Sequence, residues 1–380
     1  MNKNINKIKI LYIVTNLEMC NGVTSYVMNY FKNMDKEKFA IDFVVCQNVE
    51  IDSKDNEKIL KERNSKIFYL EQIGLKNFGR AIKKIDNFFR ENAKNYDIVH
   101  CHLLNNGAFF LHYAKKYGIK CRILHSHVTK SADTKLKKIR NDLLVPIAIK
   151  NATDYFACSN DAGKFIFKNK KYVVINNAID GNRFLYDEKK RNELRKNMNL
   201  ENAIVFGNVG RLCPQKNQLF LIDIFKFIKK KKENCKLITV GDGPWKEKMS
   251  EKIKKYELDN DVIMLESTEA IQDLYQVFDI FLFPSNYEGL GIVLIEAQTS
   301  GLRCVASNMV PEEAKITDNY TILNINDRPE KWAKNILAIL DKPYKRTSHK
   351  NELIKNNFDV KSQTEKLERI YSKLVEEYKK

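Results

Sequence analysis

Short apolar runs alternate with longer segments of helical periodicity along the whole chain of 380 residues. Runs of this kind, separated by amphipathic helical segments, predict parallel strands joined by crossover helices. In the first half the predicted strands are 8–15, 40–46, 66–69, 98–102, 122–125, 155–158 and 173–175. A second series comprises 203–209, 236–240, 262–265, 280–284 and 304–307. The pattern therefore predicts an α/β protein with two successive Rossmann-like units.

The domain boundaries follow from the same pattern. A chain of this length exceeds what one hydrophobic core usually supports, so two domains are expected. A polar stretch over residues 176–199 separates the two series of strands. We therefore expect an N-terminal domain over residues 1–175 and a second domain over residues 176–360.

Two features of the composition bear on where the chain works. No apolar run approaches the roughly 18 residues of a membrane-spanning helix, and the apolar stretch 8–14 lacks a cleavage site of small residues. The eight cysteines form no CxxC pair, and most lie in apolar runs, as is typical of free thiols in a reducing compartment. We expect a cytoplasmic protein that is neither secreted nor membrane-spanning and has no structural zinc site.

The charge is strongly basic, with a formal net charge of +18. The excess is densest in residues 115–140, where nine lysines and arginines face one acidic residue, Asp133. Such a segment attracts an anionic partner: nucleic acid, an acidic lipid surface or a phosphorylated substrate. A compositional bias toward solvated lysines explains the same count. The segment lacks the interleaved aromatic residues of a stacking surface, so nucleic acid is not expected.

The first motif with chemical content follows the predicted strand 203–209. Gly210 ends the strand, Arg211 follows at once, and Lys216 precedes a predicted helix that opens near Asn217. A guanidinium and an ammonium at a strand-to-helix turn are placed to neutralise a pyrophosphate. Arg211 alone would be an ordinary surface arginine, but the combination GRLCPQKN favours phosphate binding.

The second motif, SNYEGLGIVLIE, also follows a predicted strand. Gly289 and Gly291 let backbone amides approach a ligand, and a helix predicted to begin near Leu290 directs its N–H groups at an anion. Carboxylates accept hydrogen bonds from hydroxyls, so Glu288 and Glu296 are expected to hold two polyols. An anion with two polyols indicates a nucleotide sugar. The alternative is a helix-capping Glu288 and a solvated Glu296, but apolar neighbours of Glu296 would make an unpaired carboxylate costly.

In the first half, Gly22 stands just before a predicted helix, and histidines gather at the ends of two predicted strands. His102 and His127 lie at the ends of predicted strands, where functional sites of parallel sheets form. An imidazole there can donate a hydrogen bond to a sugar hydroxyl or to a developing charge. The other histidines of this half are expected to be satisfied core groups: His100, His112 and His125. No Asp, Glu or Cys with ligand-like spacing accompanies the HxH pattern, so no metal site is expected.

These motifs resemble those of a known family. GRLCPQKN, GDGP, FPSNYEGLGIVLIEAQTSG and the Glu-x7-Glu spacing, all between Gly210 and Gly301, look like the donor domain of glycosyltransferase family 4. Upstream, SHV, VINNAID and the segment 10–30 are similar to bacterial capsular and exopolysaccharide transferases of that family. The resemblance covers nearly the whole chain. It implies a retaining enzyme with the GT-B fold, in which two Rossmann-like domains face each other across a cleft.

The resemblance also implies roles for the residues that bind the donor. Arg211 and Lys216 match residues that bind the donor diphosphate. Glu288 matches the acid that binds the hydroxyls of the donor sugar, and Glu296 the acid that binds the ribose. The backbone near the phosphates and the sugar is presented by Gly289, Leu290 and Gly291.

Further matches lie in the N-terminal domain. His127 matches the histidine that faces the donor sugar from this domain. Gly22 matches the second glycine of a Gly-Gly loop, whose first position is Asn21 here, which departs from the family pattern. The fold usually ends with a helix that crosses back onto the first domain, and residues 361–380 have the matching periodicity.

The implied reaction transfers a sugar from a UDP-sugar to a hydroxyl of a glycan or a polyprenyl-diphosphate-linked acceptor in surface polysaccharide biosynthesis. Arg211, Lys216 and the helix amides would stabilise the charge that bond cleavage leaves on the diphosphate. A metal is therefore not expected as a cofactor. No carboxylate is placed as an attacking nucleophile, which favours a same-face route to retention. The basic segment 115–140 fits an anionic surface at the inner face of the cell membrane.

Two alternatives remain on sequence grounds. A GT-B nucleotide-sugar epimerase would share the diphosphate site but would need acid and base groups for elimination. A non-catalytic anion-binding module would use the basic segment alone. A nicotinamide oxidoreductase is disfavoured because no GxGxxG follows the first strand.

Overall fold

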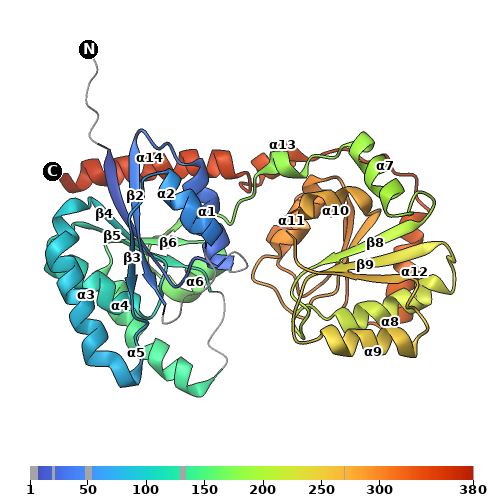
Figure 1. Cartoon of the computed structure of the whole chain (residues 1–380), viewed down its shortest axis with the longest axis horizontal. Helices are drawn as coiled ribbons and strands as arrows, with labels where there is room; N and C mark the ends of the chain where they lie inside the picture. The colour runs from blue at the N-terminus through green and yellow to red at the C-terminus, as the bar shows by residue number, and fades with distance from the viewer. Residues whose placement is uncertain (1–6, 19–21, 48–53, 129–133, 269, 380) are drawn as a thin grey trace, which may run out of the picture. The chain divides into compact units, whose positions relative to one another are not determined.

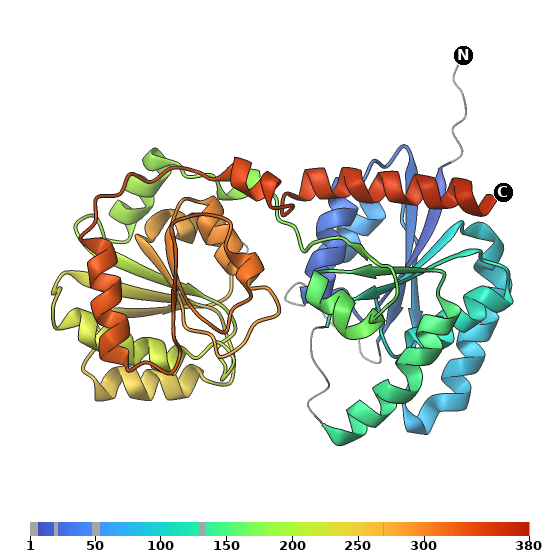
Figure 2. The same ribbon diagram turned by 180° about the vertical axis from the view of Figure 1, so that it is seen from behind.

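The computed structural model describes residues 7–18, 22–47, 54–128, 134–268 and 270–379. The chain divides into two compact units, drawn in Figure 1 and from behind in Figure 2. Unit 1 comprises residues 1–178 and 360–380, and unit 2 comprises residues 179–359. Unit 1 is thus completed only by residues that follow unit 2 in the sequence.

Unit 1 is built on a parallel sheet whose described strands run in the order β3-β2-β1-β4-β5-β6-β7. The strands are β1 (Ile8–Val14), β2 (Phe39–Cys46), β3 (Ile67–Leu70), β4 (Ile98–Cys101), β5 (Cys121–Ser126), β6 (Asp154–Ala157) and β7 (Val173–Val174). The helices are α1 (Gly22–Asn33), α2 (Lys54–Glu62), α3 (Phe78–Asn92), α4 (Gly107–Lys116), α5 (Lys135–Asn151), α6 (Asn160–Phe167) and α14 (Val360–Lys379). The central strands read as nearly continuous apolar runs because helices cover both faces of the sheet.

The two faces of this sheet bury separate clusters of side chains. On one face, α1, α2 and α14 pack against β1 and β2, with Tyr30 and Tyr371 among the fully buried residues. On the other face, α3, α4, α5 and α6 cover the sheet around Phe89 and Phe110. The helix α14 is therefore part of the core of unit 1.

Unit 2 repeats the plan with the strand order β10-β9-β8-β11-β12-β13 among the described residues. The strands are β8 (Ile204–Val209), β9 (Cys235–Val240), β10 (Val262–Leu265), β11 (Ile280–Phe283), β12 (Arg303–Ser307) and β13 (Tyr320–Leu323). The helices are α7 (Glu188–Asn197), α8 (Gln218–Lys229), α9 (Lys246–Lys255), α10 (Ile271–Val277), α11 (Ile292–Thr299), α12 (Pro329–Leu340) and α13 (Lys350–Lys355). The strand order reverses between the neighbours β8 and β11. Open α/β sheets bind ligands at such a point, outside the carboxyl ends of the strands.

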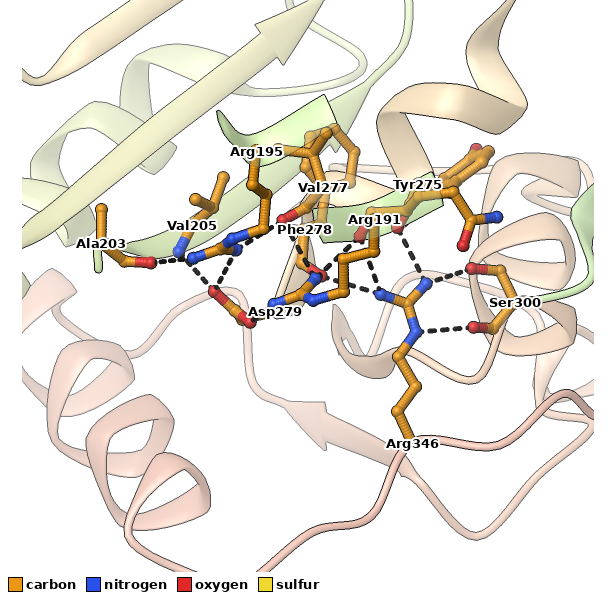
Figure 3. Close-up of polar contacts among 11 residues, drawn as sticks. Arg191, Arg195, Ala203, Val205, Tyr275, Val277, Phe278, Asp279, Ser300 and Arg346 are labelled. Atoms are coloured by element: carbon orange, nitrogen blue, oxygen red, sulfur yellow. Dashed lines mark hydrogen bonds and ion pairs between the residues drawn. The ribbon is translucent and has the colours of Figure 1, made fainter. Parts of the chain in front are cut away.

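Three arginines fix the turn that leads into β11 (Figure 3). Arg191 of α7 donates to the carbonyls of Gln276 and Phe278 at 2.7 and 2.9 Å and pairs with Asp279. Arg195 also pairs with Asp279, at 3.1 Å. From the chain after α12, the third arginine, Arg346, donates to the carbonyls of Tyr275, Phe278 and Ser300. These contacts fix the position of the start of β11. The short strand in turn fixes the position of the loop that follows it.

Most of the predicted strands are confirmed to within one or two residues at each end, and the α/β class is confirmed. β13 is missing from the prediction because this edge strand is only four residues long and only its first residue is buried. The stretch 176–199 is more than a connection, because it contains α7, which is anchored by guanidinium groups rather than by an apolar stripe. The units change at 178/179 and 359/360, where the sequence places the boundaries at 175/176 and 360/361.

Candidate active site

The loops that follow β8 and β11 flank the reversal point of the sheet in unit 2. The backbone N–H of Asn286 donates to the carbonyl of Gln215 at 2.8 Å, and its side-chain amide donates to the carbonyl of Pro214 at 2.8 Å. In return, the side chain of Gln215 donates to the carbonyl of Tyr287 at 3.2 Å. Because these bonds cross between the loops, residues 210–217 and 285–291 form one structure.

Lys216 and Glu288 meet where the two loops join. The Lys216 Nζ donates to the Glu288 Oε1 at 2.7 Å and lies 4.7 Å from the centroid of the Phe283 ring. The side chains are only 17% and 5% exposed, so the pair is largely removed from water. Gly210 has a φ of +152°, a backbone conformation that other residues rarely adopt, which explains why glycine precedes this loop. The sequence predicts these residues as separate ligands of diphosphate and sugar, and the structure brings them together as one ion pair.

Arg211 lies beside this pair in sequence but is exposed. Gln218 donates to the Arg211 carbonyl at 3.0 Å, which fixes the backbone and leaves the side chain free to move. Among the residues that the structure describes, the Arg211 guanidinium has no hydrogen-bond or ion-pair partner. A cation in this state is available to an anionic ligand at little energetic cost.

A second glycine turn supports the loop after β8. At Gly241 (φ +145°), a Cβ would lie 2.1 Å from the carbonyl oxygen of Gly210, and at Gly243 (φ +153°) 2.4 Å from that of Leu212. Neither substitution fits the described backbone. The sequence analysis uses GDGP only as a mark of resemblance and assigns it no role. The GDGP motif directly follows β9, the strand that pairs with β8. This position could have indicated a structural role for the motif.

The glycines of the second loop have distinct surroundings. Gly291 (φ +84°) is the N-cap of α11, and this conformation explains why the helix begins at Ile292 rather than near Leu290. Gly289 is exposed, and a Cβ there would meet no atom within 4 Å. Leu290 packs against the apolar cluster beneath α11. The N-terminal amides of α11 thus open next to the loop that carries Glu288.

Glu296, in α11, has an unusual environment for a carboxylate. The Tyr275 hydroxyl donates to its Oε2 at 2.8 Å, and the Val293 carbonyl lies 3.2 Å from the same hydroxyl as the weaker of two possible acceptors. Burial raises the pKa of Glu296 to about 7, although the Tyr275 hydrogen bond and the positive charge of Arg183 act in the opposite direction. Perturbed carboxylates of this kind are frequent at functional sites. The contribution of Tyr275 was not predicted, because it arises from a helix that precedes β11.

In unit 1, the reversal point lies between β1 and β4, and histidines gather at the carboxyl ends of β4 and β5. The Nδ1 of His102 and the Nε2 of His127 are 2.9 Å apart. The Nε2 of His100 and the Nδ1 of His125 are also 2.9 Å apart. Burial lowers the pKa of His127 to about 3 and holds the pKa values of the other three rings well below their usual range, so all four rings are neutral at pH 7.

The remaining predictions for this half have mixed outcomes. His100 and His125 are buried and hydrogen-bonded, as expected of core groups. His112 is exposed on α4, because the buried face of this helix passes through residues 107, 108, 110, 111 and 114, so its assignment to the core is wrong. Gly22 is the first residue of α1, and its predicted neighbour Asn21 lies outside the described residues.

The ring nitrogens of His100, His102 and His125 lie within 4.8 Å of one another, a spacing that a metal ion could use. The His100 and His125 rings are nearly parallel, with 11° between their planes, and the His100 and His102 rings are stacked at 22°. Lone pairs that lie in stacked, parallel planes do not converge on one point. The geometry therefore fits a hydrogen-bonded stack better than a coordination shell.

The described fold and loops define a class: a protein of two doubly wound α/β units with a cation and carboxylate cluster at the reversal point of the second sheet. Residues 165–360, just over half of the chain, match the family described as Glycosyl transferases group 1, and residues 20–183 match Glycosyltransferase Family 4. The chain belongs to this glycosyltransferase family.

Several relatives align over nearly their full length. The chain is 28% identical to EpsF of Bacillus subtilis (strain 168), with 96% of each chain covered. It is 24% identical to the Escherichia coli UDP-Gal:alpha-D-GlcNAc-diphosphoundecaprenol alpha-1,3-galactosyltransferase, with 97% of this chain and 98% of that one covered. It is 25% identical to the capsular polysaccharide biosynthesis glycosyltransferase CapH of Staphylococcus aureus, with 96% and 98% covered.

Solved structures confirm the predicted GT-B fold. Anabaena HepE, crystallised in complex with UDP, superposes with a TM-score of 0.78 at 18% identity, covering 96% of this chain and 100% of that chain. WaaG, a glycosyltransferase involved in lipopolysaccharide biosynthesis, superposes with a TM-score of 0.65 at 12% identity, covering 94% and 95%. Among the described residues, no helix combines the length and apolar character needed to cross a membrane.

Proposed function

We propose that the chain transfers a sugar from a UDP-sugar to a hydroxyl of a lipid-linked glycan, with retention of the anomeric configuration, in surface polysaccharide biosynthesis. The observation that carries the proposal is the cluster at the reversal point of the unit 2 sheet. It combines the exposed guanidinium of Arg211, the Lys216–Glu288 pair and the amides at the start of α11. These groups match a ligand with an anionic part next to a hydroxyl-rich part.

In this proposal the cations and the carboxylates of the cluster bind different parts of the donor. Arg211 and Lys216 bind the diphosphate, and Lys216 exchanges part of its contact with Glu288 for a phosphate oxygen. Glu288, released from that contact, accepts hydrogen bonds from the hydroxyls of the sugar. Glu296 holds the ribose. The backbone that lines the phosphates and the sugar belongs to Gly289, Leu290 and Gly291, and Gly22 of unit 1 is proposed as a further donor-binding residue.

UDP is the proposed nucleotide on the strength of related proteins. The E. coli relative is named as using UDP-Gal, and HepE is described in complex with UDP. The residues of this chain explain how the transfer of the sugar would be accelerated. As the bond between the sugar and the diphosphate breaks, negative charge grows on the leaving oxygen, and the cations and α11 amides bind it more strongly than in the ground state. His127 is neutral and acts as a hydrogen-bonding group toward the sugar.

These cations leave no requirement for a metal in the proposal, and incubation with a chelator tests this point directly. EDTA-treated protein should keep its activity, and a requirement for added Mg²⁺ or Mn²⁺ would contradict it. Retention is tested by the configuration of the new bond, read from the coupling constant of the anomeric proton in the product.

The main test is transfer activity with a panel of nucleotide sugars and a polyprenyl-diphosphate-linked acceptor. We expect product with a UDP-sugar, and a rate at least about a hundredfold lower for Arg211→Ala and Glu288→Gln, since each removes a group that binds the transition state. Arg328→Ala removes an exposed arginine of unit 2 outside these loops and should change nothing. Unchanged transfer in Arg211→Ala would contradict the assignment. Isomerised donor in the absence of acceptor would favour the epimerase.

The acceptor part of the proposal draws on the E. coli relative, whose name specifies a diphosphoundecaprenol-linked acceptor, and on unit 1. Part of the basic segment 115–140 is engaged internally. Lys116 pairs with Asp86 at 2.8 Å, and the guanidinium of Arg122 donates to the carbonyls of Ile119 and Asn151. The charges that remain available are concentrated on α5.

Helix α5 exposes both charge and apolar surface. Large aliphatic side chains stand three or four residues apart on one side of the helix, with Leu136 81% and Leu143 65% exposed and Ile139 and Ile147 also exposed. Basic residues surround this stripe: Lys135, Lys137, Lys138 and Arg140, against one acid in the helix, Asp142. An apolar stripe among lysines is typical of a helix that lies in the interface of an anionic membrane. A second copy of the chain would oppose this surface with like charge.

Vesicle flotation tests the membrane part of the proposal. The protein should float with vesicles that contain phosphatidylglycerol and not with phosphatidylcholine alone, and salt should weaken the binding. The double substitution Leu136→Ser, Leu143→Ser should abolish flotation, whereas Ile322→Ser, Ile354→Ser, which removes exposed apolar residues of unit 2, should not. Equal flotation with both lipids, or flotation of the α5 variant, would contradict the proposal.

A further inference from the structure

The four histidines at the ends of β4 and β5 form two hydrogen-bonded pairs on one face of the sheet. His100 lies in β4 and His102 directly follows this strand, and His125 and His127 have the same places in and after β5. Residues two apart in extended chain point to one face, so all four rings project toward the same helices. The rings stack, with centroids 4.3 Å apart for His100 and His102 and 4.4 Å apart for His125 and His127. Tyr26 of α1 packs edge-on against His125 and His127. The rings are therefore held in place by packing.

Each neutral imidazole has one N–H group, so each pair can place only one proton between its two facing nitrogens. In the outer pair, the proton between the His102 Nδ1 and the His127 Nε2 belongs to one ring or the other. The buried Nε2 of His102 has no hydrogen-bond partner among the described residues. The position of its single proton therefore decides whether an N–H or a bare nitrogen is left unpaired at this atom.

Of these two states, the one with an unpaired N–H is less favourable, because buried donors without partners are rarer than incompletely used acceptors. The proton of His102 is thus on Nδ1, where it donates to the His127 Nε2. The proton of His127 is in consequence on its own Nδ1. This nitrogen has no hydrogen-bond partner among the described residues, but unlike the His102 Nε2 it is not fully buried, so its N–H can donate to water or to a ligand.

The inner pair can be assigned by the same reasoning. The unpaired buried nitrogen of His125 is again its Nε2, which leaves the proton on its Nδ1, where it donates to the His100 Nε2. His100 then donates from its Nδ1 to the hydroxyl of Tyr371 at 2.5 Å, and Tyr371 donates to the hydroxyl of Tyr12 at 2.8 Å. In this direction the N–H groups of His125 and His100 and the Tyr371 hydroxyl each have an acceptor, and the chain ends at the Tyr12 hydroxyl.

We propose that His102 is a positioning residue that holds His127 in the Nδ1–H tautomer, so that His127 offers a hydrogen-bond donor, and no basic nitrogen, to its ligand. The assignment of the ligand as a sugar rests on the proposed function, whereas the tautomer does not. A group in this state binds an oxygen of the donor sugar and cannot take the proton of the acceptor hydroxyl. The general base of the reaction must then be sought elsewhere, either in another side chain or in the leaving diphosphate itself.

The direct test is the ¹⁵N spectrum of the full chain labelled at histidine, at pH 7, with the His127 signals assigned by comparison with His127→Gln. The nitrogen shifts of a protonated and a bare imidazole nitrogen differ widely, so the tautomer is read without reference to activity. We expect a protonated Nδ1 and a bare Nε2. A protonated Nε2 at His127 would overturn the proposal, and this tautomer is read in the unsubstituted chain.

Two substitutions then test the part played by His102. His102→Asn keeps an N–H donor near the His127 Nε2 and should retain the tautomer, whereas His102→Leu removes the donor and should give a mixture. With His102→Leu, kcat should fall by roughly 10- to 100-fold, as is typical for the loss of a group that orients a functional histidine, with a smaller change in the KM for the donor. His102→Asn should recover most of the loss. The exposed His112→Leu serves as the matched control and should change neither spectrum nor rate.

The outcomes separate this inference from the proposed function. If the spectrum shows the Nδ1–H tautomer but His127→Ala transfers sugar at the normal rate, the tautomer stands and the role of His127 toward the sugar fails. If His127→Ala is inactive and His102→Leu leaves the tautomer of His127 unchanged, the role of His127 toward the sugar stands. The positioning role of His102 then fails, because another contact fixes the ring.

Discussion

Lys216 shows how closely charge and position are linked at the scale of a single residue. Its ammonium is paired with the nearly buried Glu288 at 2.7 Å, and removing one partner of such a pair leaves the other charge without compensation. We expect Lys216→Met to lower the free energy of unfolding by about 3 kcal/mol, with a transfer rate at least about a hundredfold lower. Urea unfolding and initial rates measure the two effects.

The double variant Lys216→Met, Glu288→Gln separates stability from catalysis at this position. With both charges gone, no buried charge lacks a partner, so much of the stability should return while activity stays lost. If the double variant were as unstable as the sum of the two single variants, the pair would have no energetic coupling and its description as an ion pair would be wrong.

Glu296 gives a pH dependence whose direction is set by its surroundings. Burial raises its pKa to about 7 from an unfolded value near 4.5, so the folded chain binds the proton more tightly than the unfolded chain. The associated stability is fully present below pH 4.5, declines as the pH rises and is lost above pH 7, an effect of roughly 3 kcal/mol at most. The difference in unfolding free energy between wild type and Glu296→Gln, measured from pH 5 to 8, should follow this curve, and a constant difference would contradict it.

Single residues of the site could be identified from the sequence, but their partners could not. Glu288 and Lys216 stand out because they follow strands in a recognisable spacing. That they bind each other depends on hydrogen bonds between loops separated by about seventy residues, which no local pattern encodes. The Tyr275 contact to Glu296 and the pairing of His102 with His127 escape sequence reasoning for the same reason.

At the scale of elements, the turn after β9 supports the loop after β8, and Gly241 is where they touch. An alanine Cβ there would lie 2.1 Å from a backbone oxygen, at a φ that non-glycine residues avoid. We expect Gly241→Ala to destabilise the chain by about 2 kcal/mol or more and to weaken UDP binding, as measured by thermal unfolding and calorimetry. Gly289→Ala meets no neighbour and should leave stability unchanged, and unchanged stability in Gly241→Ala would show that the Gly241 contact is unimportant.

The elements that the sequence predicts well are those whose burial is apolar. The strands of both sheets are covered on two faces, so their apolar runs are unmistakable. α7 escapes notice because its anchors are Arg191 and Arg195, whose guanidinium groups are held by carbonyls and by Asp279 rather than by apolar contact. β13 escapes because an edge strand is covered less completely than a central one.

At the scale of the whole molecule, each unit has its own buried clusters, so each should unfold as a separate cooperative element. UDP should raise only the transition of unit 2, by about 2.7 kcal/mol at a hundred times its Kd. Hydrogen exchange should show protection in residues 204–217 and 280–296 and none in β2 or β3. The Lys216→Met, Glu288→Gln variant should lose the shift, and protection confined to unit 1 would contradict the assignment of the donor site.

The place of α14 in the core of unit 1 has a consequence for synthesis on the ribosome. Leu367, Tyr371 and Val375 are buried in one cluster with residues of β1 and β2, which were translated more than 300 positions earlier. During translation, one apolar face of unit 1 therefore stays uncovered until unit 2 has been synthesised completely. Domains usually fold in the order in which they are synthesised, but here the first one made is completed last. The part of the chain that is synthesised first would therefore need a chaperone for its aromatic surface for the longest time.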